Sequence, residues 1–189
     1  MQSIFSNNRI PLNDYRLIID TPPVIKKKIA ALKTSFDEDY RGMVIAGGNP
    51  FIYLATFSQH ESTEHLINEA IDRIALGFMP FKLHLKNLHN LDEHEIYVAL
   101  GETNIIKYLI NELKTIQSAL INPRFNDIPR ITIAQRLMPW QFAKSWPKFQ
   151  HKHLSGTFLA DKMLLLKRME GFRSWQIIRY LAFQNLVVA

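Results

Sequence analysis

A strand-like stretch from Ile128 to Leu137 carries a pair of residues whose types suit the binding of a phosphate group. It reads IPRITIAQRL, with Arg130 two positions before Thr132. Side chains alternate along a strand, so both residues would face the same side. A guanidinium fork binds a phosphate bidentately, and a hydroxyl adds a further donor. Because arginine stays protonated at neutral pH, the pair predicts anion binding and no proton transfer.

A second stretch of the same form lies in the first half of the chain. Residues 50–57 read PFIYLATF and residues 129–136 read PRITIAQR, so each strand-like run begins with a proline. A helix-like pattern precedes and follows each run. We expect two weakly similar halves that place these strands side by side about a pseudo-twofold axis.

The composition is that of a globular domain. Of the 189 residues, 47% are hydrophobic and 21% are charged. A chain of this length can bury roughly 70% of its unfolded surface, so a sizeable core is possible. No low-complexity linker separates the halves. We therefore expect residues 1–189 to form a single bilobal domain, with its oligomeric state left open.

The chain contains no cysteine and carries a formal net charge of +6. The lack of thiols excludes disulfides and thiolate metal sites, and the positive charge favours anionic partners such as phosphates, nucleotides or RNA. The first residues lack the apolar core of a signal peptide. No apolar run approaches the ~20 residues of a membrane span. We expect a cytoplasmic protein with no membrane partner.

Hydrophobic periodicity predicts the elements that position the candidate residues. Amphipathic helices are predicted at residues 24–36, 61–76, 103–121 and, in a shorter form, 139–146. Pro22 and Pro23 suit the start of the first helix, and its lysines are predicted to form the solvated face. Strands are predicted at residues 14–20, 42–48, 51–57, 81–88, 94–100, 128–137, 156–169 and 174–183. Since neighbouring strands are expected to pair antiparallel, the class is α+β.

Over nearly its whole length the chain resembles the 2H phosphoesterase superfamily, the 2′-5′ RNA ligase and cyclic nucleotide phosphodiesterase type. The resemblance is carried by the opening strand, Pro-Pro and helix, by the two proline-led strands, and by the closing KMLLLKR and SWQIIRYLAF segments. Members carry two His-x-Thr-x motifs, one in each lobe. The resemblance implies a bilobal fold of two pseudo-twofold-related halves, with antiparallel sheets lining a central cleft, helices outside, and no metal or cofactor.

The motif positions are altered in this chain. Phe51 stands at the first histidine position and Tyr53 at the first threonine position; Arg130 replaces the second histidine, and Thr132 alone matches. In the family one histidine takes a proton and the other donates one. Each such group accelerates the reaction by roughly 10²- to 10⁴-fold. Phe51 and Arg130 can do neither. We expect a catalytically degenerate protein that binds a phosphorylated ligand, a nucleotide or an RNA end, through Arg130, Thr132 and Tyr53.

Plainer interpretations of these residues stay open. Arg130 could be a structural ion-pair partner that fills a vacated cleft, and Thr132 a β-forming residue kept on its strand. Phe51 and Tyr53 could be core aromatics. Two other functions remain as alternatives: a divergent phosphoesterase acting on 2′,3′-cyclic or 2′-5′ phosphodiesters, with His60 or Tyr53 in an unfamiliar role, and a non-catalytic protein-interaction module.

The histidines do not predict a metal site. His84, His89 and His94 are spaced by five residues, and that spacing does not place side chains on one helical face. No third ligand or carboxylate pattern accompanies the two histidines of HKH at 151–153. His60 follows the first motif strand by a few residues, and a surface loop position is the plainer interpretation for it.

Overall fold

The computed structural model describes residues 10–40 and 49–186, in which nine strands form two antiparallel sheets and four α-helices pack on them. The fold is therefore α+β, as predicted. The strand predicted at 42–48 lies outside the described residues. No helix in the described part of the chain combines the length and the hydropathy needed to cross a membrane.

The larger sheet has five strands in the order β5-β2-β1-β8-β9. Helices α2 (Glu64–Gly77) and α3 (Thr103–Lys114) contact strands of this sheet and each other. Short 3₁₀ turns at Glu61–Thr63 and Gln117–Ala119 flank them. The strands are β1 (Leu12–Ile19), β2 (Ile52–His60), β5 (Ile121–Phe125), β8 (Lys162–Arg168) and β9 (Gln176–Ala182).

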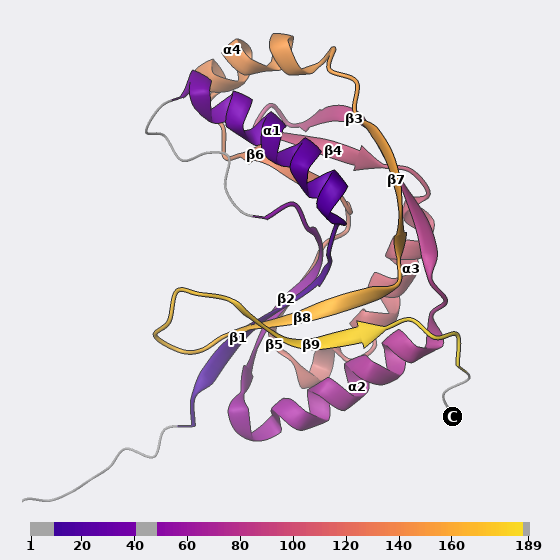
Figure 1. The fold of residues 1–189 in the computed structure, drawn as a ribbon. Coiled ribbons are helices and arrows are strands. Elements are labelled where there is room, and N and C mark those ends of the chain that lie inside the picture. The colour runs from indigo at the N-terminus through magenta and orange to yellow at the C-terminus, as the bar shows by residue number, and fades with distance from the viewer. Residues whose placement is uncertain (1–9, 41–48, 187–189) are drawn as a thin grey trace, which may run out of the picture.

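The smaller sheet has four strands in the order β6-β4-β3-β7. Its strands are β3 (Phe81–Leu91), β4 (Glu95–Leu100), β6 (Ile131–Gln135) and β7 (Ser155–Ala160). Helices α1 (Pro23–Asp39) and α4 (Pro139–Phe149) lie together against this sheet, whereas α2 lies at the opposite end of the molecule, against the larger sheet (Figure 1). The predicted bilobal arrangement, with helices outside, is confirmed.

Alternation along β1 shows how the sequence separates the two faces of the larger sheet. Tyr15, Leu17 and Ile19 are at most 2% exposed and belong to the main core. Asp14 and Arg16 point to the opposite face because successive side chains of a strand alternate. The face that does not pack on α2 and α3 therefore carries charge close to apolar residues.

Helix α1 starts at Pro23, whose fixed φ suits the first helical position. Ile25, Ile29 and Phe36 are buried on one stripe, as their spacing predicts. The expectation that the lysines of this helix form the solvated face is wrong for Lys33, which is 9% exposed. Lys33 follows Ile29 by four positions, so it falls on the buried stripe of the helix.

Most predicted boundaries move by a few residues, and two predicted elements differ from the structure by more. The helix predicted at 103–121 ends at Lys114. The residues after it include the 3₁₀ turn at Gln117–Ala119 and lead to β5, which starts at Ile121. The single strand predicted at 156–169 is two strands, because β7 pairs with β3 in the smaller sheet while β8 pairs with β1 in the larger one. The chain changes sheet at Asp161, between β7 and β8. Partner choice between distant strands is not encoded in local periodicity.

Candidate anion-binding site

The two motif strands meet at one pocket between the lobes. Phe51 and Tyr53 reach it from the β2 side, and Arg130 and Thr132 reach it from the β6 side. We call it the motif pocket; it has a volume of about 200 Å³, and its other lining residues are Lys33, Asn49, Glu95, Asn126 and Gln135. All four motif positions thus line a single pocket, although β2 and β6 belong to different sheets.

Arg130 is held by the carboxylate of Glu95, the first residue of β4. Its Nε donates to Glu95 Oε1 at 2.8 Å and its Nη2 donates to Oε2 at 2.7 Å. A third bond runs from Nη1 to the carbonyl of Ile128 at 3.0 Å. The side chains of Arg130 and Glu95 are 18% and 12% exposed, so this fork-to-fork pair is largely shielded from water.

Thr132 also binds the carboxylate of Glu95. Its hydroxyl donates to Glu95 Oε1 at 2.6 Å. The guanidinium carbon of Arg130 also lies 5.5 Å from the centroid of the Tyr97 ring. The hydrogen bonds to Glu95 raise the pKa of Arg130 above its ordinary value, against the opposing effect of burial. Arg130 and Thr132 together bind an oxyanion here, and that oxyanion belongs to the protein itself.

The β2 side of the motif pocket is aromatic. The rings of Phe51 and Tyr53 meet edge to face, with centroids 6.2 Å apart. Both pack on a small apolar cluster of Ile18, Leu164 and Leu166. The backbone carbonyl of Tyr53 accepts a hydrogen bond from Asn126 Nδ2 at 2.8 Å. This side therefore offers an aromatic stacking surface and one phenol.

Lys33 is a pocket residue that sequence reasoning missed. Burial lowers the pKa of its ammonium, and Asp37 partly opposes that effect. Its place on the apolar stripe of α1, one turn after Ile29, is the signal that could have identified it. Among the described residues, the motif pocket therefore holds two cationic side chains, Lys33 and Arg130, and one carboxylate, Glu95.

A second and larger pocket, of about 710 Å³, lies on the larger sheet. We call it the arginine pocket, because Arg16 of β1, Arg124 of β5 and Arg168 of β8 line it. It also includes Trp175, which precedes β9, and the polar residues Asp14, Thr56, Ser58 and Asn122. Nothing in the local sequence patterns predicted it, since its arginines come from three separate strands.

One of these arginines is paired within the protein. Arg168 Nη2 donates to Asp14 Oδ2 at 2.6 Å, and the Ser58 hydroxyl donates to Asp14 Oδ1 at 2.9 Å. Burial tends to raise the pKa of Asp14, but these hydrogen bonds and the nearby charges hold it below its ordinary value. Asp14 is therefore a carboxylate whose two oxygens are already engaged.

Arg16 has a different environment. Its guanidinium carbon lies 3.9 Å from the centroid of the Trp175 ring and 5.6 Å from that of Tyr53. Its side chain forms no hydrogen bond or ion pair with any residue that the structure describes. Burial lowers the pKa of its guanidinium. Aromatic rings thus fix Arg16, while its N–H donors have no protein acceptor in the described part of the chain.

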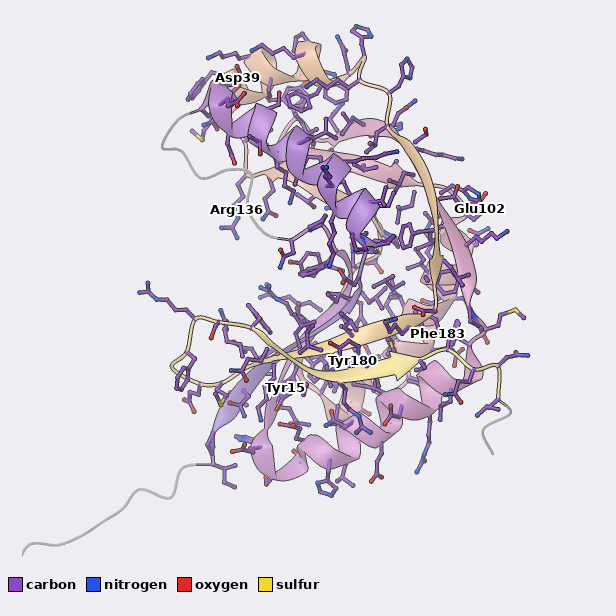
Figure 2. The ribbon with its side chains drawn as sticks, viewed as in Figure 1. Tyr15, Asp39, Glu102, Arg136, Tyr180 and Phe183 are labelled. Carbon is purple, nitrogen blue, oxygen red and sulfur yellow. The ribbon has the colours of Figure 1, made fainter. Side chains whose placement is uncertain are left out.

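The histidines take no part in either pocket. His60 ends β2 as an exposed residue and lines neither of them. His84 pairs through Nδ1 with Glu102, a residue that Figure 2 shows on the side of the molecule away from Arg136. Arg136 follows β6 and lies on the open side between the lobes (Figure 2). Among the described residues, no group of three histidines or carboxylates is arranged to hold a metal ion.

Comparison with solved structures identifies the fold. The chain superposes on TT0787 of Thermus thermophilus with a TM-score of 0.66 at 11% identity, covering 90% of this chain and 98% of that one. Escherichia coli LigT in complex with 3′-AMP gives a TM-score of 0.65 at 16% identity, with 92% and 98% coverage. A protein described as a phosphoesterase gives 0.62 at 15% identity, with 90% and 98% coverage.

No family model matches the sequence, and no curated protein matches it either. The likeness to these three structures therefore shows a shared LigT-like fold. It extends over almost the full length of each of those proteins.

Proposed function

We propose that this chain is a catalytically degenerate 2H phosphoesterase-like protein that binds a phosphorylated ligand, a nucleotide or the end of an RNA strand, between its lobes. The proposal rests on the hydrogen bonds that Arg130 and Thr132 donate to the Glu95 carboxylate. A carboxylate and a phosphate present the same pair of oxygens to a guanidinium fork. The motif pocket therefore has the donors that a phosphate needs.

A ligand phosphate must compete with Glu95 for these donors. When the phosphate enters, the Glu95 side chain has to leave Arg130 and Thr132 and find other partners or water. Burying a displaced carboxylate beside a phosphate costs free energy, so the competition weakens binding. Besides Arg130 and Thr132, the described side chains of this pocket that carry donor groups are Lys33, Tyr53 and three amides, Asn49, Asn126 and Gln135. We expect measurable but modest affinity in the wild-type protein.

The loss of catalysis follows from the residue types at the motif positions. Cleavage of a cyclic phosphodiester needs a group that accepts a proton and a group that donates one near neutral pH. Phe51 has no exchangeable proton, and the raised pKa of Arg130 keeps it protonated. Glu95 is occupied by Arg130 and Thr132. The fold shared with LigT, whose solved complexes include one with 3′-AMP, supports phosphoester binding as the retained property.

A divergent phosphoesterase is the second candidate, and Lys33 is the observation that favours it. An ammonium whose pKa is lowered by burial is a better general acid than an exposed lysine. With the phenol of Tyr53 in the same pocket, a proton donor and a second polar group are present. This candidate predicts turnover that disappears in both Lys33→Met and Tyr53→Phe.

One titration separates the two candidates. Wild-type protein and Arg130→Gln are titrated with 3′-AMP and with 2′,3′-cyclic AMP, and bound ligand and hydrolysis product are measured in the same samples. The proposed function predicts binding of both nucleotides without product, and weaker binding in the variant. Product formation by the wild type, abolished in Lys33→Met, would establish the second candidate. Absence of binding to either nucleotide would contradict both and leave a protein-interaction module.

A further inference from the structure

The arginine pocket carries an excess of positive charge that the described protein does not neutralise. Three arginines and one carboxylate line it, which gives its walls a net charge of +2. Asp14 already accepts hydrogen bonds from Arg168 and Ser58. Arg16 and Arg124 form no ion pair with any described residue. The pocket is therefore set up to attract an anion from solvent.

Arg16 is the donor of the pocket whose guanidinium is held by aromatic rings and has no described acceptor. Stacking on Trp175 at 3.9 Å covers a face of the guanidinium, and Tyr53 lies at 5.6 Å. A guanidinium donates hydrogen bonds from its edge, in the plane of the group, so stacked rings leave its N–H groups available. Holding the side chain in place before binding reduces the entropy lost when a ligand binds. The polar side chains of Thr56 and Asn122 also line the pocket and can donate to the same oxyanion.

The arginine pocket adjoins the motif pocket. Tyr53 lines the motif pocket, and the face of its ring carries Arg16, which lines the arginine pocket. Tyr53 and Trp175 pack against the apolar cluster of Ile18, Leu164 and Leu166, and Arg16 lies opposite Leu166 in the pairing of β1 with β8. A ligand that extends past Tyr53 from one pocket therefore reaches the other.

We propose that the arginine pocket binds a second phosphate of the ligand, so that the preferred ligand carries two phosphates on one sugar–phosphate unit. The inference rests on the proposed function for the first phosphate, which lies in the motif pocket. Arg16 is the anchor of the second phosphate, and Arg124 and Arg168 add positive charge around it. Binding at two linked sites raises affinity because the second contact becomes intramolecular.

The test compares a ligand with one phosphate and a ligand with two. Adenosine 3′,5′-bisphosphate and 3′-AMP are titrated into the wild-type protein, Arg16→Gln and Arg73→Gln. Arg73 is an exposed residue of α2, on the helix side of the larger sheet, so its variant has the same charge change away from the pocket. The quantity of interest is the ratio of the two dissociation constants in each protein.

In the wild type we expect the bisphosphate to bind about 10- to 100-fold more tightly than 3′-AMP, the gain typical of charge-assisted hydrogen bonds to one phosphate. Arg16→Gln should reduce this ratio to near one, and Arg73→Gln should keep it. Arg124→Gln, an exposed position, gives a second and weaker loss if Arg16→Gln does not fold. A ratio near one in the wild type, or an unchanged ratio in both pocket variants, would overturn the inference.

The same experiment separates this inference from the proposed function. A preference for the bisphosphate that depends on Arg16 but survives Arg130→Gln places phosphate binding in the arginine pocket and removes it from the motif pocket. Dependence on both arginines supports both claims. A ribotrinucleotide with a 3′-phosphate, titrated in parallel, distinguishes a nucleic-acid strand from a small nucleotide as the ligand. Tighter binding than the bisphosphate indicates a nucleic-acid strand, equal binding indicates a small nucleotide, and both require Arg16.

Discussion

The motif pocket and the arginine pocket use the same residue type in opposite ways. In the motif pocket Arg130 is satisfied by Glu95, Thr132 donates to the same carboxylate, and both ionic partners are largely buried. In the arginine pocket Arg16 is held by aromatic rings and has no described acceptor. An arginine paired within the fold contributes to folding stability, whereas an arginine without an acceptor is available to a ligand. Charge alone therefore does not identify an anion-binding site.

The comparison predicts that Arg130 matters more for stability than Arg16. Arg130→Ala leaves the carboxylate of Glu95 shielded from water without its partner, and such a change costs about 3 kcal/mol. Arg16→Ala removes ring contacts on a half-buried side chain and costs about 1 kcal/mol. Urea unfolding of the two variants, followed by circular dichroism, measures both free energies.

A double variant provides the control for this difference. Arg130→Leu combined with Glu95→Leu removes both charges, and replacing a buried ion pair by apolar residues is often neutral. We expect the double variant to recover most of the loss seen in Arg130→Ala. Equal losses of unfolding free energy in Arg130→Ala and Arg16→Ala would contradict the difference proposed between the two pockets.

Trp175 is expected to affect binding more than stability. Its ring contacts the guanidinium groups of both Arg16 and Arg168, at 3.9 and 4.9 Å from the centroid. Each such contact is worth about 0.5–1 kcal/mol at an accessible site, so Trp175→Ala should weaken binding of adenosine 3′,5′-bisphosphate roughly threefold to tenfold. Trp140→Ala, at an exposed position of α4, is the matched control. A similar loss in both variants would show that Trp175 does not organise the pocket.

Substitution of Asp14, the carboxylate that lines the arginine pocket, has the smallest expected effect on ligand affinity. Asp14→Asn raises the net charge of the pocket walls from +2 to +3, and we expect bisphosphate binding to tighten about twofold to threefold at low salt. The gain should shrink as ionic strength rises. Unchanged binding at low salt would indicate that the ligand phosphate does not approach this carboxylate.

Acid unfolding supplies a second readout for Asp14. Its folded-state pKa lies below its ordinary value, so the stabilisation from the pair with Arg168 is complete above roughly pH 4. That stabilisation is lost as the pH falls through the folded-state pKa. The Asp14→Asn variant should therefore lose less stability than the wild type between pH 4 and pH 2, although the exposed position keeps the difference small.

Local sequence patterns predicted the parts of the fold that local physics controls. The spacing of Ile25, Ile29 and Phe36 and the proline at position 23 were sufficient to predict α1. The division of residues 156–169 into β7 and β8 was not predictable in this way, because it depends on which distant strand each half pairs with. Local patterns carry no information about that choice.

The same distinction applies to the site. The resemblance to the 2H fold correctly brought Phe51, Tyr53, Arg130 and Thr132 to one pocket. It could not reveal Glu95, because the contact depends on the pairing of β4 with β6, in which Tyr97 lies opposite Thr132. The arginine pocket was not predictable from local patterns either, since residues from five separated segments line it. That Arg130, Thr132 and Tyr53 bind a ligand stays a prediction.

Removal of Glu95 tests the central claim, that the motif pocket is an oxyanion site filled by the protein's own carboxylate. Inorganic phosphate is titrated into Glu95→Ala, built on Arg16→Gln so that the arginine pocket does not contribute, and into Arg16→Gln alone. Without the competing carboxylate, Arg130 and Thr132 are open to the ligand. We predict that phosphate binds the Glu95→Ala protein at least about tenfold more tightly, the gain expected for one charge-assisted interaction. Equal or weaker binding would contradict the claim and leave the pair of Arg130 and Glu95 with a structural role alone.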